Sequence, residues 1–193
     1  MEWASNIRGH ASEVLNNDVQ MWSTVFSPGS GLVSWTSWWN SLSSLEAAMA
    51  GLVANAKYLS LAAEGAQFVD GGVDDILSQT VFGEPSGNTN VTYAGVVQAV
   101  AANGKIGEAM VAGVGLAQKA AEVSGTPTMF LRGLTGAYGG VAWVSAYENL
   151  AAMETAQSKL EADPSWLSTI DSSGHCFNAG PASTQSVILL KVG

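Results

Sequence analysis

The hydrophobic and polar positions of the second half of the chain switch between the strand period of two and the helical period of 3.6. The predicted elements there are four strands and two helices, with a short apolar segment opened by Asp163-Pro164: strands at 91–100, 128–135, 141–145 and 186–192, and helices at 105–122 and 149–161. The order strand, helix, strand, strand, helix, strand is that of a split βαβ unit.

The first half predicts the same order in a more compact form. A strand over 3–8 precedes a helix that starts at Asn16 or Asn17 and carries Val19, Trp22, Val25 and Phe26 on one face. A strand over 32–39 and a long helix capped by Ser44 follow. The turn Asp70-Gly71-Gly72 then leads to a closing strand over 76–82.

A short internal repeat supports two halves built alike. Residues 39–49 match residues 143–153 at five of eleven positions, with an offset of 143 − 39 = 104, so that Trp39 is paired with Trp143. The polar stretch 83–90 lies near the middle of the chain and has no apolar anchor. We therefore predict one unit over 1–84, a linker over 85–90 and a second unit over 91–193.

The Trp-bearing strand that leads into an acidic, Ala-rich helix (Trp143 to Leu150, then Leu160 to Trp166) resembles the dimeric α+β barrel superfamily of ferredoxin-like domains, closest to its NIPSNAP-like and stress-responsive members. The resemblance implies an α+β fold of two tandem ferredoxin-like units, whose antiparallel sheets close into one pseudo-two-fold barrel. The superfamily includes haem-degrading and quinone-forming monooxygenases, polyketide cyclases, isomerases and members without known activity. Membership therefore implies a ligand cavity and no particular reaction.

Charge and composition exclude several classes of partner. Seven Lys and Arg against sixteen Asp and Glu leave no basic stripe for nucleic acid or for an anionic membrane surface. Only 12% of the residues are charged, which favours self-association and predicts a homo-oligomer. No apolar run is long enough to span a bilayer, and the single Cys176 fits a reducing compartment, so we expect a cytoplasmic protein.

Candidate catalytic residues are few, because the chain has only two histidines, His10 and His175. His175 lies in a polar loop with Asn178, where it is either a general base or haem ligand, or a surface histidine beside a buried Cys176. A nucleophilic Cys176 is disfavoured, because neighbours on an extended chain point apart. No metal-ligand spacing is recognised, and the residues imply no cofactor; the resemblance implies haem as the alternative.

Candidate ligand-binding residues are Trp35, Trp38, Arg8, Arg132 and Tyr138. The tryptophans line a cavity for a flat apolar ligand or form an interface, and the arginines clamp a carboxylate or face solvent. We predict a protein that binds a small apolar ligand in a Trp-lined barrel cavity. A monooxygenase, cyclase or isomerase of the same superfamily, and a structural protein whose repeat serves assembly, are the alternatives.

Overall fold

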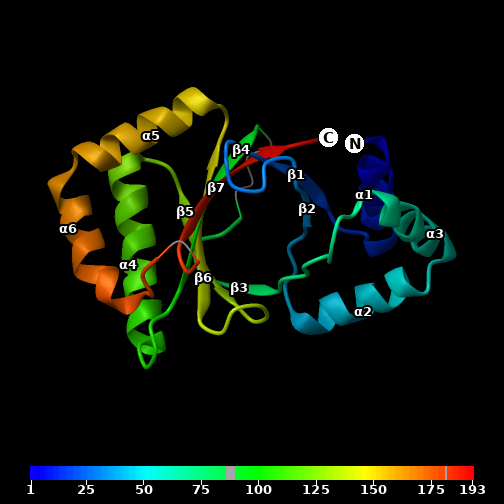
Figure 1. Cartoon of the computed structure of the whole chain (residues 1–193), viewed down its shortest axis with the longest axis horizontal. Coiled ribbons are helices and arrows are strands. Elements are labelled where there is room, and N and C mark those ends of the chain that lie inside the picture. The colour runs from blue at the N-terminus through cyan, green and yellow to red at the C-terminus, as the bar shows by residue number, and fades with distance from the viewer. Residues whose placement is uncertain (86–89, 181) are drawn as a thin grey trace. The chain divides into compact units, whose positions relative to one another are not determined.

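The computed structural model describes residues 1–85, 90–180 and 182–193, and it divides the chain into two compact units (Figure 1). Unit 1 consists of Met1–Thr24, Gly29–Asp74 and Lys191–Gly193, and unit 2 consists of Val25–Pro28 and Asp75–Leu190. The predicted linker at 85–90 lies mostly outside the described residues, because 86–89 are not among them.

Unit 2 is built on an antiparallel sheet with the strand order β7-β4-β6-β5-β3. Its strands are β3 (Ser78–Phe82), β4 (Tyr93–Val100), β5 (Thr128–Gly133), β6 (Gly140–Tyr147) and β7 (Gln185–Lys191). Tyr93 of β4 lies opposite Tyr147 of β6 and Leu190 of β7, so β4 is a central strand. Without β3 the order is that of a split βαβ unit. The predicted α+β class and antiparallel sheet are confirmed.

Three helices lie on one side of this sheet (Figure 1): α4 (Ile106–Ser124), α5 (Leu150–Ala162) and α6 (Pro164–Ser173). Helices α4 and α5 contact the strands, and α6 packs on α4 and α5. Local signals set their ends. Asn149 and Asp163 cap α5 and α6 by accepting backbone N–H bonds at 2.8 Å, and Gly125 ends α4 in the left-handed conformation. The strands and helices predicted for the second half are therefore confirmed within a few residues.

The core of unit 2 forms where α4 meets the sheet. Ala99, Ala117, Phe130 and Val141 are buried together, with the half-buried Trp143 against them. The Trp143 ring lies 5.2 Å from that of Phe130, and its indole N–H donates to the Gly113 carbonyl at 2.9 Å. Trp143 therefore packs against this core, and Gly113 marks a close approach of α4 to Phe130 of β5.

Unit 1 contains a β-hairpin and three helices. Its elements are α1 (Glu2–Leu15), β1 (Gln20–Val25), β2 (Val33–Thr36), α2 (Leu42–Val53), α3 (Ala56–Gly65) and the 3₁₀ turn η1 (Ala66–Phe68). In the hairpin, Met21 lies opposite Trp35. Ala11, Val19 and Leu52 form the main buried cluster.

Two elements predicted at the start of the chain are wrong. Residues 3–8 belong to helix α1, because Ala4, Ile7 and Ala11 share one buried face at helical spacing. The predicted helix over 16–26 is instead strand β1, whose pairing with β2 overrides the helical spacing of its apolar residues. Asn16, read as the start of a helix, ends α1 with a φ of 47°.

The long helix predicted from Ser44 is in fact two helices. Ser41 caps the start of α2, and α2 ends at Ala54. Asn55 then caps α3 by accepting the Tyr58 N–H at 2.9 Å. Asn55 therefore starts a new helix within a continuous apolar period.

The starts of several elements in the two halves are related by one constant offset, which differs from the predicted 104. Helix α5 begins at Leu150 and α2 at Leu42, so the offset is 150 − 42 = 108. The same offset relates α3 to α6, η1 to η2 (Gly174–Cys176) and β1 to β5. Trp39, which follows β2, is thus not equivalent to Trp143 in β6. The error of four residues is about one helical turn, which keeps the Ala-rich faces aligned.

Candidate functional site

A cavity of about 360 Å³ opens in unit 2 between the first turns of α4 and the connection from β5 to β6. Ile106 and Met110 of α4 form its apolar wall, and Arg132 stands at its edge on β5. The connecting residues 134–139 complete the lining, with Tyr138 among them. Two of the predicted ligand-binding residues, Arg132 and Tyr138, therefore line one cavity.

The rim of this cavity is fixed by hydrogen bonds to the segment before and within β3. The Arg132 Nε–H donates to the Gln79 side-chain oxygen at 2.8 Å. Leu77 holds the connection at two points, since its N–H donates to the Thr135 hydroxyl at 2.8 Å and its carbonyl accepts the Leu134 N–H at 2.7 Å. The guanidinium is thereby oriented through one nitrogen, while Arg132 remains exposed.

The cavity combines one fixed cation with an apolar wall. Its volume lies near the lower end of the range of small-molecule sites, about 300–1,000 Å³. A guanidinium presents paired N–H donors that match a carboxylate or phosphate. Tyr138 is 89% exposed and so forms the outer lip of the cavity. The arrangement suits a small organic anion with an apolar body.

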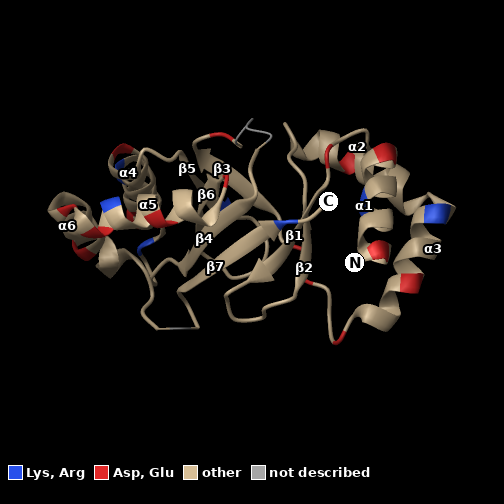
Figure 2. Ribbon diagram, turned by 90° about the horizontal axis from the view of Figure 1, so that it is seen from above, with Lys and Arg blue, Asp and Glu red and all other residues tan. Residues whose placement is uncertain are grey.

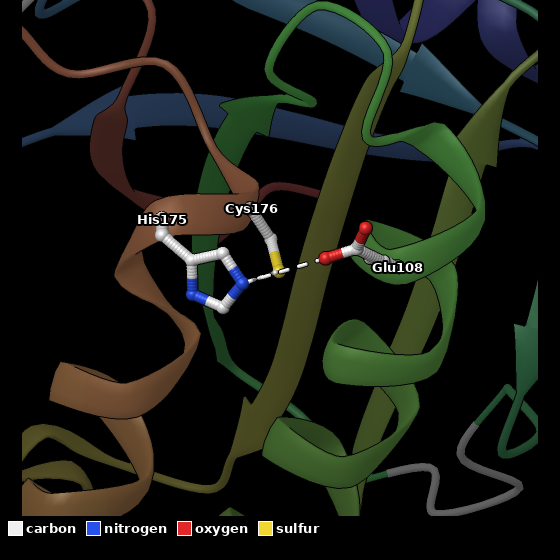
Figure 3. A group of neighbouring side chains, drawn as sticks. All are labelled: Glu108, His175 and Cys176. Atoms are coloured by element: carbon white, nitrogen blue, oxygen red, sulfur yellow. Dashed lines mark hydrogen bonds and ion pairs between the residues drawn. The ribbon is translucent and has the colours of Figure 1, made fainter.

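A second group of side chains gathers at the start of α4 (Figure 3). The turn η2 places His175 and Cys176 side by side, with 3.5 Å between the ring Nε2 and the thiol Sγ. Glu108 of α4 lies 3.5 Å from the same Nε2 through its Oε2. The premise that His175 and Cys176 point apart is wrong, because they lie on a 3₁₀ turn and not on an extended segment.

Hydrogen bonds define the state of this group. The Ser172 carbonyl lies 2.9 Å from His175 Nδ1 and can only accept, so in the neutral ring Nδ1 carries the proton and Nε2 presents its lone pair. The Lys105 ammonium donates to both oxygens of Glu108, at 2.7 and 2.9 Å. This hydrogen bond is the largest cause that lowers the pKa of Glu108, and the same contact raises the pKa of Lys105.

Asn178, predicted beside His175 as a catalytic residue, fastens the loop to the end of β4. Its N–H donates to the Val100 carbonyl at 2.8 Å, and its side-chain amide donates to the Ala101 carbonyl at 3.4 Å. The Ala102 N–H in turn donates to the Cys176 carbonyl at 2.8 Å. Asn178 lines neither described cavity and positions the backbone that carries His175 and Cys176.

The remaining predicted residues lie in unit 1 and do not share a cavity. Trp35 stacks edge-on against Trp3 at 5.9 Å, and Trp38 accepts a bond from Asn17 through its carbonyl. Neither tryptophan, nor Arg8, lines the second cavity of about 360 Å³, which is bordered by Ser5, Asn6, Gly9, His10, Glu13, Lys57 and Leu61. His10 within it is tied to the capping Asn55 side chain at 2.9 Å.

Haem, which the resemblance implies as an alternative cofactor, does not fit the residues present. The Nε2 of His175 faces Glu108 and Cys176 and no apolar slot, and the His175 side chain is 61% exposed. His10 lies in a cavity bordered mainly by polar side chains.

Sequence reasoning missed Glu108, because its partners lie 175 − 108 = 67 residues away. The local signal was the Lys105-Glu108 spacing at the start of a predicted helix, which describes an ion pair and not a site. The Lys and Arg side chains are spread over several elements of the described chain (Figure 2). Among the described residues, no helix is both long and apolar enough to cross a membrane.

Comparisons show the fold. A proposed monooxygenase of Fusobacterium nucleatum matches 100% of this chain and 84% of its own, with a TM-score of 0.68 at 10% identity. An anthrone oxidase-like protein matches 100% of this chain and 86% of its own (TM-score 0.62, 14% identity), and a proposed monooxygenase of Lactobacillus acidophilus matches 98% and 84% (0.58, 8%). No protein-family model matches the chain, and no curated protein is significantly similar to it.

Proposed function

We propose that the protein binds a small organic anion with an apolar body in the cavity between α4 and the β5–β6 connection. The observation that carries this proposal is the guanidinium of Arg132, oriented by Gln79 at the edge of a cavity whose α4 wall is apolar. Charge-assisted hydrogen bonds from arginine give the anion its orientation, and Ile106 and Met110 supply apolar contact. This replaces the predicted Trp-lined cavity with one lined by Arg132 and Tyr138.

The test is a calorimetric titration with 1-naphthoate, a flat aromatic carboxylate, beside the neutral 1-naphthalenemethanol. Arg132→Gln is expected to weaken naphthoate binding about 10- to 100-fold, the value of a charge-assisted hydrogen bond, and to leave the neutral analogue unchanged. Arg8→Gln is the matched control, because Arg8 is the other arginine of the chain and does not line this cavity.

A second variant separates shape from charge. Met110→Trp fills the cavity from α4 and is expected to weaken both ligands equally. Equal binding of naphthoate by the natural protein, Arg132→Gln and Met110→Trp would refute the proposal.

The comparisons favour a second candidate, a monooxygenase that acts on an aromatic substrate in the same cavity. The structures that match this chain over its whole length include one described as a proposed monooxygenase and one described as anthrone oxidase-like. Anthrone and dioxygen yield anthraquinone and water in a balanced reaction, so an oxygen electrode with anthrone as substrate tests this candidate directly. Oxygen uptake that Met110→Trp abolishes would support it, and uptake no faster than without protein would exclude anthrone as the substrate.

We also propose that residues 1–84 and 91–193 are tandem copies of one ferredoxin-like unit. The constant offset of 108 residues between α2 and α5, α3 and α6, and β1 and β5 supports this. Among the described elements of the first copy, none corresponds to β4. The predicted homo-oligomer stays a prediction, which sedimentation velocity would test.

A further inference from the structure

Three potential ligand atoms of different chemistry converge at the start of α4: a carboxylate oxygen of Glu108, the imidazole Nε2 of His175 and the thiol sulfur of Cys176. These atoms all lie within 4.8 Å of one another, and Figure 3 shows the three side chains pointing together from two separate segments. Such a set of lone pairs is stabilised when a cation is placed among them.

We propose that Glu108, His175 and Cys176 form a binding site for one divalent transition-metal ion of the zinc type. A sulfur, an imidazole nitrogen and a carboxylate oxygen are ligands that zinc accepts together, whereas calcium and magnesium prefer oxygen alone. The site is separate from the Arg132 cavity and does not depend on the proposed function.

Two of the three separations between the ligand atoms match a tetrahedral ion. The Glu108 oxygen and the Cys176 sulfur lie within 4.8 Å of each other, against about 3.6 Å in a tetrahedral site, so the carboxylate moves inward on binding. With zinc–nitrogen and zinc–oxygen bonds near 2.0–2.1 Å and a zinc–sulfur bond near 2.3 Å, tetrahedral angles give about 3.6 Å between nitrogen and sulfur and about 3.3 Å between nitrogen and oxygen. The corresponding separations here are 3.5 Å for both pairs. The Glu108 carboxylate is exposed, so it can adjust to the ion without disturbing the core.

The histidine is oriented as a metal ligand requires. Its Nδ1–H is bound to the Ser172 carbonyl, so Nε2 is left as the donor atom. Cys176 is only 3% exposed, and its backbone is held against Ala102 at the end of β4. The nitrogen and the sulfur are therefore held in place before any ion arrives, which lowers the entropic cost of binding.

Lys105 competes with the ion for Glu108. Its ammonium donates to both carboxylate oxygens, and its positive charge opposes the binding of a second cation by the same group. The Lys105 side chain is 39% exposed and can turn into solvent. On binding, the Cys176 thiol loses its proton to solvent and the thiolate sulfur forms the bond to the metal. Three protein ligands leave a fourth position for water.

The experiment is a titration of the full chain with Co²⁺ alone, followed by absorption, and then displacement by Zn²⁺ in a calorimeter. A cobalt–thiolate charge-transfer band reports directly on Cys176, because the chain has no other cysteine. The expected result is a band that saturates at one equivalent, is absent in Cys176→Ala and is lost on adding Zn²⁺. Glu108→Gln and His175→Gln are expected to weaken binding by more than about tenfold.

Two further variants sharpen the test. Lys105→Gln is expected to tighten binding, because it removes the competing ammonium. Glu122→Gln is the matched control: Lys119 and Glu122 form the same type of ion pair on α4, at 3.2 Å, away from the Glu108 group. The affinity of Glu122→Gln for Co²⁺ is expected to equal that of the natural protein.

Three outcomes would overturn the proposal. The first is the absence of a charge-transfer band. The second is a band that Glu108→Gln and His175→Gln leave unchanged, which would show binding by the thiol alone. The third is binding of several equivalents that no variant alters. Because Glu108 and His175 are exposed, their variants keep the fold, which circular dichroism verifies.

Discussion

Substitution of Gly113 and of Gly115 in α4 by alanine is expected to change the free energy of unfolding in opposite directions. A Cβ at Gly113 would lie less than 3 Å from three ring carbons of Phe130, with Cε1 at 2.6 Å, whereas a Cβ at Gly115 would meet nothing within 4 Å. Both positions are in the interior of the same helix, so the gain in helix propensity is shared. The two variants therefore differ only in packing.

The magnitudes follow from these contacts. Replacing Gly by Ala in a helix interior stabilises by about 1 kcal/mol, and this is the whole effect expected for Gly115→Ala. At Gly113 the added methyl group must displace Phe130, which is fully buried against Trp143, and Trp143 is itself bonded to the Gly113 carbonyl. Overpacking of this kind costs about 1–3 kcal/mol. We expect Gly113→Ala to lower the free energy of unfolding by up to about 2 kcal/mol.

The assay is urea unfolding followed by circular dichroism, with scanning calorimetry beside it. For a chain of this length, 1 kcal/mol corresponds to about 2–4 °C in Tm. Gly115→Ala is expected to raise Tm by that amount and Gly113→Ala to lower it by up to about twice as much. Equal stabilisation by both substitutions would show that α4 does not approach Phe130 as described, and would refute the packing argument.

Three other predictions concern capping and buried groups. Asn149→Ala removes the cap of α5 and is expected to cost about 1 kcal/mol in urea unfolding, whereas Asn149→Asp keeps the acceptor. The hydrogen bond from Ser165 is the largest cause that lowers the pKa of Asp163. The ionised Asp163 therefore stabilises the fold at pH values above 3.8, the ordinary pKa of the group, and this stabilisation is lost as the pH falls. Acid titration of Tm in Asp163→Asn, with Asp171→Asn as control, checks this. Burial raises the pKa of Tyr147, so stability should fall as the pH rises above 10, and Tyr147→Phe should flatten that alkaline limb.

The elements of unit 2 could be predicted because their ends are local signals. Asn149, Asp163 and Gly125 each cap a helix through bonds to residues within four positions. In unit 1 the same signals were ambiguous. Asn16 belongs to the end of α1 and not to the start of the next element. The pairing of β1 with β2, in which Met21 lies opposite Trp35, makes residues 20–25 a strand. That pairing is a contact between two segments of the chain, and the hydrophobic period within one segment does not predict it.

In the candidate site, too, the features set by local sequence could be predicted, and those set by contacts between distant segments could not. Arg132 lies at the end of β5 and Tyr138 within the connection that follows it, so their proximity follows from the predicted hairpin alone. The Glu108 group needs the end of β4, the start of α4 and the turn η2 to meet, and that meeting depends on backbone bonds from Ala102 and Asn178. The sequence around residues 174–176 is polar and contains Gly, so it predicts a loop and not the 3₁₀ turn that the structure shows.

The central position of β4 has a consequence for how the chain is made. One neighbour of β4 is β7, whose first residue, Gln185, follows Tyr93 by 185 − 93 = 92 positions. At about 5–20 residues per second, a ribosome takes roughly 5–20 s to cover that distance. Throughout this interval one edge of β4 is open, and it presents an uncharged strand to other nascent chains. The sheet of unit 2 is completed only when the last strand has left the ribosome.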